Sequence, residues 1–158
     1  MNIFSENKKA LFDYEVLERF EAGLVLFGQE VKSIKTGHIN LSGSYVALKQ
    51  EPARHNATAL GVEPFLVGVK VPPYQPNNAG ADYGEERQRK LLLSKKEIDY
   101  LIGKTKVKGF SLIPLKVYDK SGRIKLEFGL AKGKKKYNKK EKIKKRDVER
   151  EVNRELSA

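Results

Sequence analysis

Alternating apolar and polar positions run through the first part of the chain and predict β-strands. Residues 14–20 alternate in this way, with a break at Leu17 and Glu18, and an apolar run over 24–27 follows Gly23. A period of two is typical of a strand that buries one face. The pattern therefore predicts strand structure on both sides of Gly23.

Two further strands are predicted in the first half of the chain, over 44–48 and 65–71. Both stretches are rich in β-branched and aromatic residues, which favour strands. Pro72 and Pro73 end the second stretch, because proline has no N–H to donate to a sheet ladder.

The clearest hairpin signal lies between strands expected over 111–118 and 124–130. The connecting residues 119–122 read Asp-Lys-Ser-Gly, a composition typical of tight turns. Pro114 lies inside the first of these strands, so we expect either a sheet edge or a bulge at that point.

Two short helices are expected between the strands. The first covers 29–35, with Gly37 as its C-cap. The second begins after the N-cap Ser94, which forms a capping box with Glu97, and it ends at Gly103. Many short antiparallel strands with a few helices predict a mainly β fold, a small barrel that is closed or partly open.

The charge balance indicates a polyanionic partner. The 158 residues include 32 Lys and Arg against 20 Asp and Glu, and the net charge of +12 favours nucleic acid or an anionic membrane surface. There is no Cys, which excludes a disulfide framework and a thiolate site. No apolar run reaches the length of a signal peptide or a membrane span. We expect a soluble, cytoplasmic protein of one domain with a tail.

Most of the net charge lies near the C-terminus. Residues 132–146 hold ten basic side chains and one acidic side chain, a net of +9, and their only large apolar residues are Tyr137 and Ile143. Such a stretch buries too little surface to order a free chain. We expect a globular domain over 1–132 and a basic tail over 133–158. The tail is either a solvated segment without a role or a helix that forms when phosphates neutralise its lysines.

No group of residues suggests catalysis. His38 and His55 lie apart in loop-like contexts, whereas a metal site needs three or four converging ligands. Residues 103–105 read Gly-Lys-Thr, like the end of a phosphate-binding loop, but the upstream glycine is missing. Glu85 and Glu86 lie among arginines, where ion pairing explains them better than acid–base chemistry. We expect no metal, no cofactor and no enzymatic activity.

Six motifs match one known family in order and spacing. They resemble the small protein B (SmpB) family, the SsrA-binding proteins that partner transfer-messenger RNA in bacterial ribosome rescue. The resemblance runs from about Asn7 to the C-terminus. The motifs are Asn7-Lys8-Lys9-Ala10, Phe20-Glu21-Ala22-Gly23, Glu30-Val31-Lys32-Ser33, Asn40-Leu41-Ser42 with Ser44-Tyr45-Val46, Arg89-Lys90-Leu91-Leu92-Leu93, and Gly129-Leu130-Ala131-Lys132-Gly133-Lys134-Lys135.

The resemblance implies an oligonucleotide-binding (OB) type of barrel that grips the tRNA-like domain of transfer-messenger RNA. It also implies that the complex enters the empty A site of a stalled ribosome, with elongation factor Tu in the same complex. The C-terminal tail is then expected in the vacant mRNA channel at the decoding centre, where it becomes helical. The resemblance implies no reaction catalysed by the protein itself and no membrane partner.

The resemblance also implies which residues hold RNA. In the barrel they are Asn7, Glu21, Arg89, Lys90, Leu92, Lys125 and Lys132, and in the ribosome-binding tail they are Gly133, Lys134, Lys135, Lys139 and Lys140. The basic residues suit phosphates, whereas Glu21 suits base amino groups or a 2′-hydroxyl. Other roles stay open: an ion pair within the barrel for Glu21, a core position for Leu92 and a cap for Asn7.

Some positions depart from the family pattern. Leu11 and Phe12 stand where the family has Arg-His, and residues 138–140 read Asn-Lys-Lys in place of Asp-Lys-Arg. Lysine keeps the charge of arginine but not its bidentate geometry. Two alternative functions are kept: a generic RNA-binding or ribosome-assembly factor, and an RNA-processing enzyme that uses scattered carboxylates and a metal.

Overall fold

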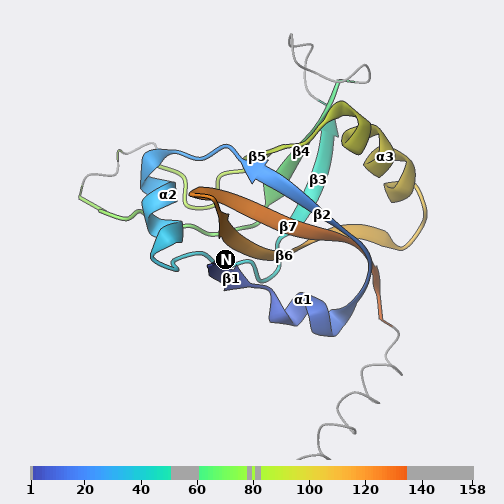
Figure 1. Cartoon of the computed structure of the whole chain (residues 1–158), viewed down its shortest axis with the longest axis horizontal. Helices are drawn as coiled ribbons and strands as arrows, with labels where there is room; N and C mark the ends of the chain where they lie inside the picture. Colours follow the sequence, from blue (N-terminus) through green and yellow to red (C-terminus); the bar gives the residue numbers. More distant parts are fainter. Residues whose placement is uncertain (1, 51–60, 78–79, 81–82, 135–158) are drawn as a thin grey trace, which may run out of the picture.

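The computed structural model describes residues 2–50, 61–77, 80 and 83–134 of the chain. This part consists of strands joined by short connections and three short helices (Figure 1). The strands are β1 (Ile3–Glu6), β2 (Tyr14–Leu24), β3 (Tyr45–Gln50), β4 (Val62–Val67), β5 (Arg89–Leu92), β6 (Phe110–Lys120) and β7 (Arg123–Gly133). The helices are α1 (Lys8–Asp13), α2 (Gly28–Lys35) and α3 (Lys95–Thr105).

The strands form one antiparallel sheet in the order β1-β6-β7-β2-β5-β4-β3. The sheet curls so that β3 comes back against β6, yet no hydrogen-bond ladder joins these two described strands. Its interior holds an apolar core that includes Leu66, Leu91, Leu126 and Phe128, and α3 adds Leu101. The prediction of a mainly β, OB-like barrel is confirmed, and the barrel takes the partly open form.

The hairpin of β6 and β7 forms where the sequence predicts it. Its turn has positive φ angles at Ser121 (52°) and Gly122 (82°). Two positive φ angles belong to the type I′ turn, whose twist matches the twist of the strands that it joins. The register shifts between Pro114 and Lys116, so the bulge expected at the proline is present. A bulge leaves one residue unpaired and thereby tolerates the missing N–H.

β2 is one long strand with an irregularity near its start. The register with β7 shifts between Val16 and Glu18, at the point where the sequence alternation breaks. The strand continues through Gly23 and ends at Leu24. The expectation of strand structure over 24–27 is therefore wrong beyond Leu24, because the chain leaves the ladder to enter α2.

β4 is displaced from its predicted range of 65–71. It begins at Val62 and ends at Val67, because Gly68 adopts a positive φ of 82° that no strand can contain. Beyond Gly68 only an isolated bridge between Asn40 and Lys70 continues the pairing.

Both expected helices form. After α2, Gly37 adopts a φ of 85° and its N–H bonds to the carbonyl of Ile34 at 2.9 Å. Ser94 Oγ accepts a hydrogen bond from the Glu97 N–H at 3.2 Å, so the predicted capping box is present. The predicted end at Gly103 is wrong, because α3 continues for two more residues and one glycine costs a helix only about 1 kcal/mol.

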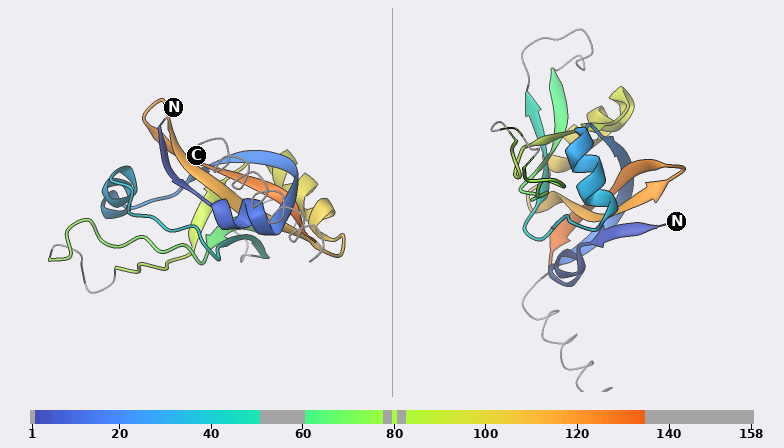
Figure 2. Two further views of the ribbon diagram at one scale, coloured as in Figure 1. Left: turned by 90° about the horizontal axis from the view of Figure 1, so that it is seen from below. Right: turned by 90° about the vertical axis from the view of Figure 1, so that its left-hand side faces the viewer.

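Three elements have no counterpart among the sequence predictions: β1, α1 and β5. Helix α1 covers one end of the β6–β7 hairpin, where Ala10 packs on Ile113 and Ala131. At the opposite end, α2 and the segment between β4 and β5 project together from the barrel (Figure 2). Gln29 of α2 accepts a hydrogen bond from the Gln75 N–H of that segment at 3.0 Å.

Candidate nucleic-acid interface

One surface of the sheet brings charged and apolar side chains together on four neighbouring strands. Alternate residues of β2, β5, β6 and β7 point away from the core, and we call this surface the outer face. In the register of the sheet, Gly23 lies opposite both Leu92 and Lys125, Glu21 lies opposite Glu127, and Tyr118 lies opposite Lys125. The outer face comprises Arg19, Glu21, Gly23, Leu92, Lys116, Tyr118, Lys120, Lys125 and Glu127.

Leu92 and Lys125 converge over Gly23. The position that a Cβ of Gly23 would take lies 3.2 Å from Leu92 Cδ1 and 3.6 Å from Lys125 Nζ. Leu92 is 56% exposed, while its neighbour Leu91 is buried in the core. The core position considered for Leu92 is thus excluded, and the glycine provides the room that lets the two side chains meet.

Lys125 is the cation of the outer face that makes no ion pair with a described carboxylate. Among the described residues, no carboxylate lies within ion-pair distance of its Nζ. An ammonium group without a carboxylate partner is well placed to contact phosphate.

Glu21 is held in a hydrogen-bond network on the same surface. It accepts hydrogen bonds from the Tyr118 hydroxyl and from Lys120 Nζ at 3.0 Å. These contacts, that of Tyr118 first, hold the pKa of Glu21 below its ordinary value. The ion pair considered for Glu21 is therefore present. Because an ionised carboxylate offers about four acceptor sites, the partly exposed side chain keeps sites for a ligand.

Tyr118 acts as the fixed donor of this network. Burial, and then its hydrogen bond to Glu21, raise its pKa far above the ordinary value. The hydroxyl therefore stays protonated and can only donate to the carboxylate. Sequence analysis missed this residue, although the predicted hairpin, once paired across its turn, places Tyr118 beside Lys125.

Glu127 is the cross-strand neighbour of Glu21 on the outer face. Its carboxylate pairs with Arg19 at 2.6 Å and with Lys116 at 3.2 Å. Burial acts to raise the pKa of Glu127, but these two hydrogen-bonded cations outweigh it and lower the pKa. Arg19 and Lys116 thus share one carboxylate, whereas Lys125 has no ion-pair partner among the described residues.

Arg89 lies beneath the surface. Its side chain is 1% exposed, and its Nε donates to Glu30 Oε2 at 2.6 Å. Its other two nitrogens donate to the carbonyl oxygens of Val69, Arg87 and Glu85. This position leaves no exposed donor for phosphate, so the arginine that the family resemblance assigns to RNA holds the fold together in this structure.

Glu30 is the centre of that buried cluster. It accepts hydrogen bonds from the Phe27 N–H at 2.9 Å and from Arg87 Nη2 at 2.5 Å, besides that from Arg89. Burial acts to raise its pKa, but these donors outweigh it and hold the pKa below the ordinary value. The cluster ties the start of α2 to β5, the strand that carries Leu92.

Asn7 caps α1 and is buried. Its Oδ1 accepts from the Ala10 N–H at 3.2 Å, and its Nδ2 donates to the carbonyls of Pro114 at 2.9 Å and Leu41 at 3.3 Å. The capping role considered from the sequence is therefore present.

The remaining predicted residues lie away from Glu21, Leu92 and Lys125. Lys90 faces Glu63 at 3.6 Å. Lys132 is exposed near the end of β7, opposite Glu15. Gly133 ends that strand, and Lys134 Nζ donates to the carbonyl of Leu11 at 3.2 Å. Lys135, Lys139 and Lys140 lie outside the described residues, as do the predictions made for the tail.

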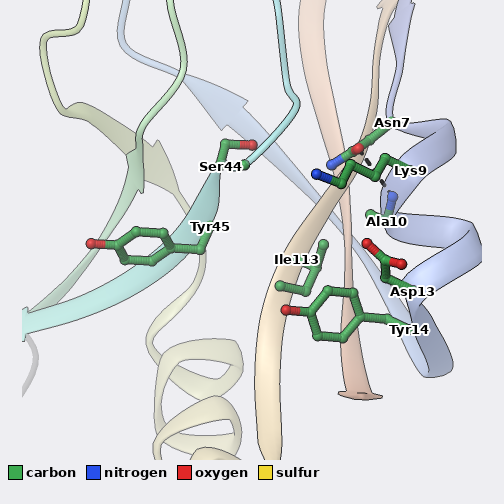
Figure 3. Close-up of a pocket in the computed structure, with 9 residues that line it drawn as sticks. Asn7, Lys9, Ala10, Asp13, Tyr14, Ser44, Tyr45 and Ile113 are labelled. Carbon is green, nitrogen blue, oxygen red and sulfur yellow. Dashed lines mark hydrogen bonds between the residues drawn. The ribbon is translucent and has the colours of Figure 1, made fainter. Parts of the chain in front are cut away.

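A groove opens where α1 and the start of β2 face β3 (Figure 3). Its two adjoining parts measure about 250 and 460 Å³ and share Tyr14, Tyr45 and Ile113. Figure 3 shows Tyr14 and Tyr45 reaching it from different strands, with Asn7 and Lys9 at its rim. Gly133 pairs with Tyr14, so β7 ends beside this groove rather than at the convergence of Leu92 and Lys125.

Within the part of the chain that the structure describes, no group of three or more His, Cys, Asp or Glu residues is arranged to hold a metal ion. No helix in that part is long and apolar enough to cross a membrane.

The fold and the outer face together define a small basic β-barrel protein with an open, ligand-accessible sheet surface. A family model described as "SmpB protein" matches residues 4–158. The SsrA-binding proteins of Thermosynechococcus vestitus and Nitratiruptor sp. are 42% and 46% identical over 139 and 140 residues, which are 88% of this chain and 84% and 86% of theirs. The chain therefore belongs to the SmpB family, and the resemblance seen in the sequence is confirmed.

A solved structure supports the same assignment. It is described as "tmRNA-SmpB: a journey to the center of the bacterial ribosome" and matches with a TM-score of 0.62 and 38% identity. The match covers 84% of this chain and 85% of the solved chain.

Proposed function

We propose that this protein binds transfer-messenger RNA through its outer face and serves as the adaptor of trans-translation, the process that rescues stalled ribosomes. Membership of the SmpB family and the name of the relatives, SsrA-binding protein, support the identity of the RNA. The convergence of Leu92 and Lys125 over Gly23, beside Glu21, carries the assignment to the outer face.

The three side chains offer three different contacts to a folded RNA. Lys125 neutralises a phosphate, which gives affinity without sequence preference. Leu92 packs against a sugar or an unstacked base. Glu21 accepts from a base amino group or a 2′-hydroxyl, and because it repels phosphate it favours one orientation of the RNA. We assign the tRNA-like domain of transfer-messenger RNA to this surface.

The test is a comparison of affinities for the isolated tRNA-like domain and for an ordinary tRNA at near-physiological salt. The wild-type protein should prefer the tRNA-like domain. Lys125→Ala should weaken that binding and reduce the salt slope by about 0.7–0.9, the value for one lost phosphate contact. Lys108→Ala removes an exposed lysine outside the outer face, and it should change neither the affinity nor the salt slope. Equal, salt-sensitive binding to both RNAs would instead indicate a generic RNA-binding or ribosome-assembly factor.

The proposal gives residues 133–158 a second role as a tail distinct from the domain over 1–132. In it, Gly133, Lys134, Lys135, Lys139 and Lys140 contact ribosomal RNA in the vacant mRNA channel at the decoding centre, and elongation factor Tu joins the complex. The cytoplasm, where ribosomes translate, is the proposed site of action. Substituting Lys139 and Lys140 together by Gln should impair rescue of stalled ribosomes in a reconstituted system. The same variant should bind the isolated tRNA-like domain as the wild type does.

No catalytic step belongs to this function. Purified protein incubated with transfer-messenger RNA and Mg²⁺ should therefore leave the RNA intact. Metal-dependent cleavage that persists in a highly purified sample would favour the alternative of an RNA-processing enzyme.

A further inference from the structure

An exposed apolar strip continues the outer face beyond the end of β2. Residues Gly23, Val25 and Phe27 follow one another at the spacing of one sheet face, while Leu24 and Leu26 pack against the core. The Val25 N–H still bonds to the carbonyl of Lys90 at 3.0 Å, so the chain keeps running beside β5 towards α2 (Figure 1).

The strip is unusually accessible for its residue types. Val25 is 43% exposed, Phe27 is 60% exposed, and Leu92 lies beside them on β5. Large apolar side chains that gather on an exposed surface commonly mark an interaction site.

Arg87 fixes one side of the Phe27 ring. Its guanidinium carbon lies 4.3 Å from the ring centroid, within the range of a cation–π contact. Nη2 is anchored by Glu30 at 2.5 Å and by the carbonyl of Val25 at 3.3 Å. Nη1 donates to the carbonyl of Gln88 at 3.4 Å. Nε is covered and has no hydrogen-bond acceptor among the described residues, so the guanidinium plane is held by the ring and by its two terminal nitrogens.

We propose that Phe27, backed by Arg87, is a stacking site for an unpaired nucleobase of the bound RNA. This inference rests on the proposed function and extends it, because it adds a base-binding position at the α2 end of the outer face. A single exposed ring with a guanidinium behind it suits a planar base, and proteins hold unstacked bases on aromatic and arginine planes. The charge around the strip agrees, since Arg87 and Lys125 border it.

The absence of tryptophan from the sequence allows a direct test. Phe27→Trp creates a single tryptophan, which can be excited selectively over the seven tyrosines, and stacking on a base should quench its emission as the isolated tRNA-like domain is added. The quenching midpoint should agree with the affinity measured independently. Val107→Trp, at an exposed position between α3 and β6, is the control and should not be quenched.

Affinity measurements complete the test. Phe27→Ala should weaken binding about 5- to 150-fold, the equivalent of one lost base–aromatic stack of about 1–3 kcal/mol. Phe27→Leu, which keeps an apolar side chain but no π face, should also weaken it. Phe27→Trp should retain or improve the affinity, and Val107→Ala should leave it unchanged.

The outcomes separate this inference from the function on which it rests. The wild type can select the tRNA-like domain while Phe27→Trp is not quenched and Phe27→Ala binds normally. That result would refute the stacking site, and the strip would then be assigned to a protein partner. If the wild type shows no selectivity for that RNA, the proposed function and the inference fail together.

Discussion

Tyr118 on β6 donates its hydroxyl hydrogen bond to Glu21 on β2, across the intervening strand β7. Lys120 adds an ion pair to the same carboxylate at 3.0 Å. The contact lowers the pKa of Glu21, while burial raises that of Tyr118. At neutral pH the pair therefore presents an ionised acceptor in a fixed orientation on the outer face.

Tyr118→Phe should disturb this orientation without removing the ring. The loss of one hydrogen bond to a carboxylate should raise the pKa of Glu21 and weaken binding of the tRNA-like domain about 2- to 10-fold, by ~0.5–1.5 kcal/mol. Carboxyl NMR titration and fluorescence anisotropy measure the two effects. Tyr74→Phe is the matched control, because the Tyr74 hydroxyl has no hydrogen-bond partner among the described residues. A raised pKa with unchanged affinity would show that the orientation of Glu21 does not matter for RNA.

Gly23→Ala should affect RNA binding more than folding. Its new Cβ would lie 3.2 Å from Leu92 Cδ1, so the Leu92 side chain must shift, whereas Lys125 Nζ at 3.6 Å would be in ordinary contact. Because Leu92 is exposed, the free energy of unfolding should change by less than about 1 kcal/mol, while RNA affinity falls. Gly103→Ala, where nothing lies within 4 Å of the added Cβ, should stabilise α3 slightly and leave affinity unchanged. Equal affinity of Gly23→Ala and wild type would show that the position of Leu92 over Gly23 does not matter for RNA binding.

Arg89→Met should destabilise the fold by about 3–5 kcal/mol, because it leaves the buried Glu30 with Arg87 as its remaining described cation and takes the donor from three backbone carbonyls. Chemical denaturation measures the loss. Arg89→Met combined with Glu30→Met should recover part of it, since the buried carboxylate is gone, although Arg87 then loses its ion pair. A single substitution that leaves stability unchanged would mean that the buried pair contributes little.

Acid should lower the free energy of unfolding by protonating Glu30 and Glu127. Both have folded-state pKa values below the ordinary 4.5. At a pH between the folded-state pKa and 4.5, the unfolded chain therefore binds more protons than the folded chain does. The stabilisation is complete above pH 4.5 and is lost as the pH falls towards the folded-state values. Glu127→Gln should therefore flatten the loss of unfolding free energy between pH 5 and pH 3 in denaturant titrations. An identical acid dependence in the variant would contradict the role of its two cation partners.

The sequence predicted the parts of the fold that depend on local chemistry. The Ser121-Gly122 turn, the Ser94 cap and the bulge near Pro114 each follow from the conformational limits of those residues. β5 was not predicted as a strand, because its charged first residue, Arg89, is buried by partners distant in sequence. Such a position has no local signature.

In the candidate site too, features set by local sequence were predicted and features set by contacts distant in sequence were not. The family resemblance singled out Glu21, Leu92 and Lys125, and the strand register brings the three to one surface. Phe27 and Arg87 drew no attention, because their importance arises from a cation–π contact between residues 60 positions apart. Exposure also decided between roles that the sequence left open: it placed Leu92 outside the core and Arg89 inside it.

The central claim is that the RNA lies on the outer face. Amide chemical shifts of ¹⁵N-labelled full-length protein, recorded while the tRNA-like domain is added, test it most directly. We expect the largest changes at Gly23, Leu92 and Lys125, with little change at Lys108. Changes confined to the groove around Tyr14 and Tyr45, with the outer face unperturbed, would contradict the account.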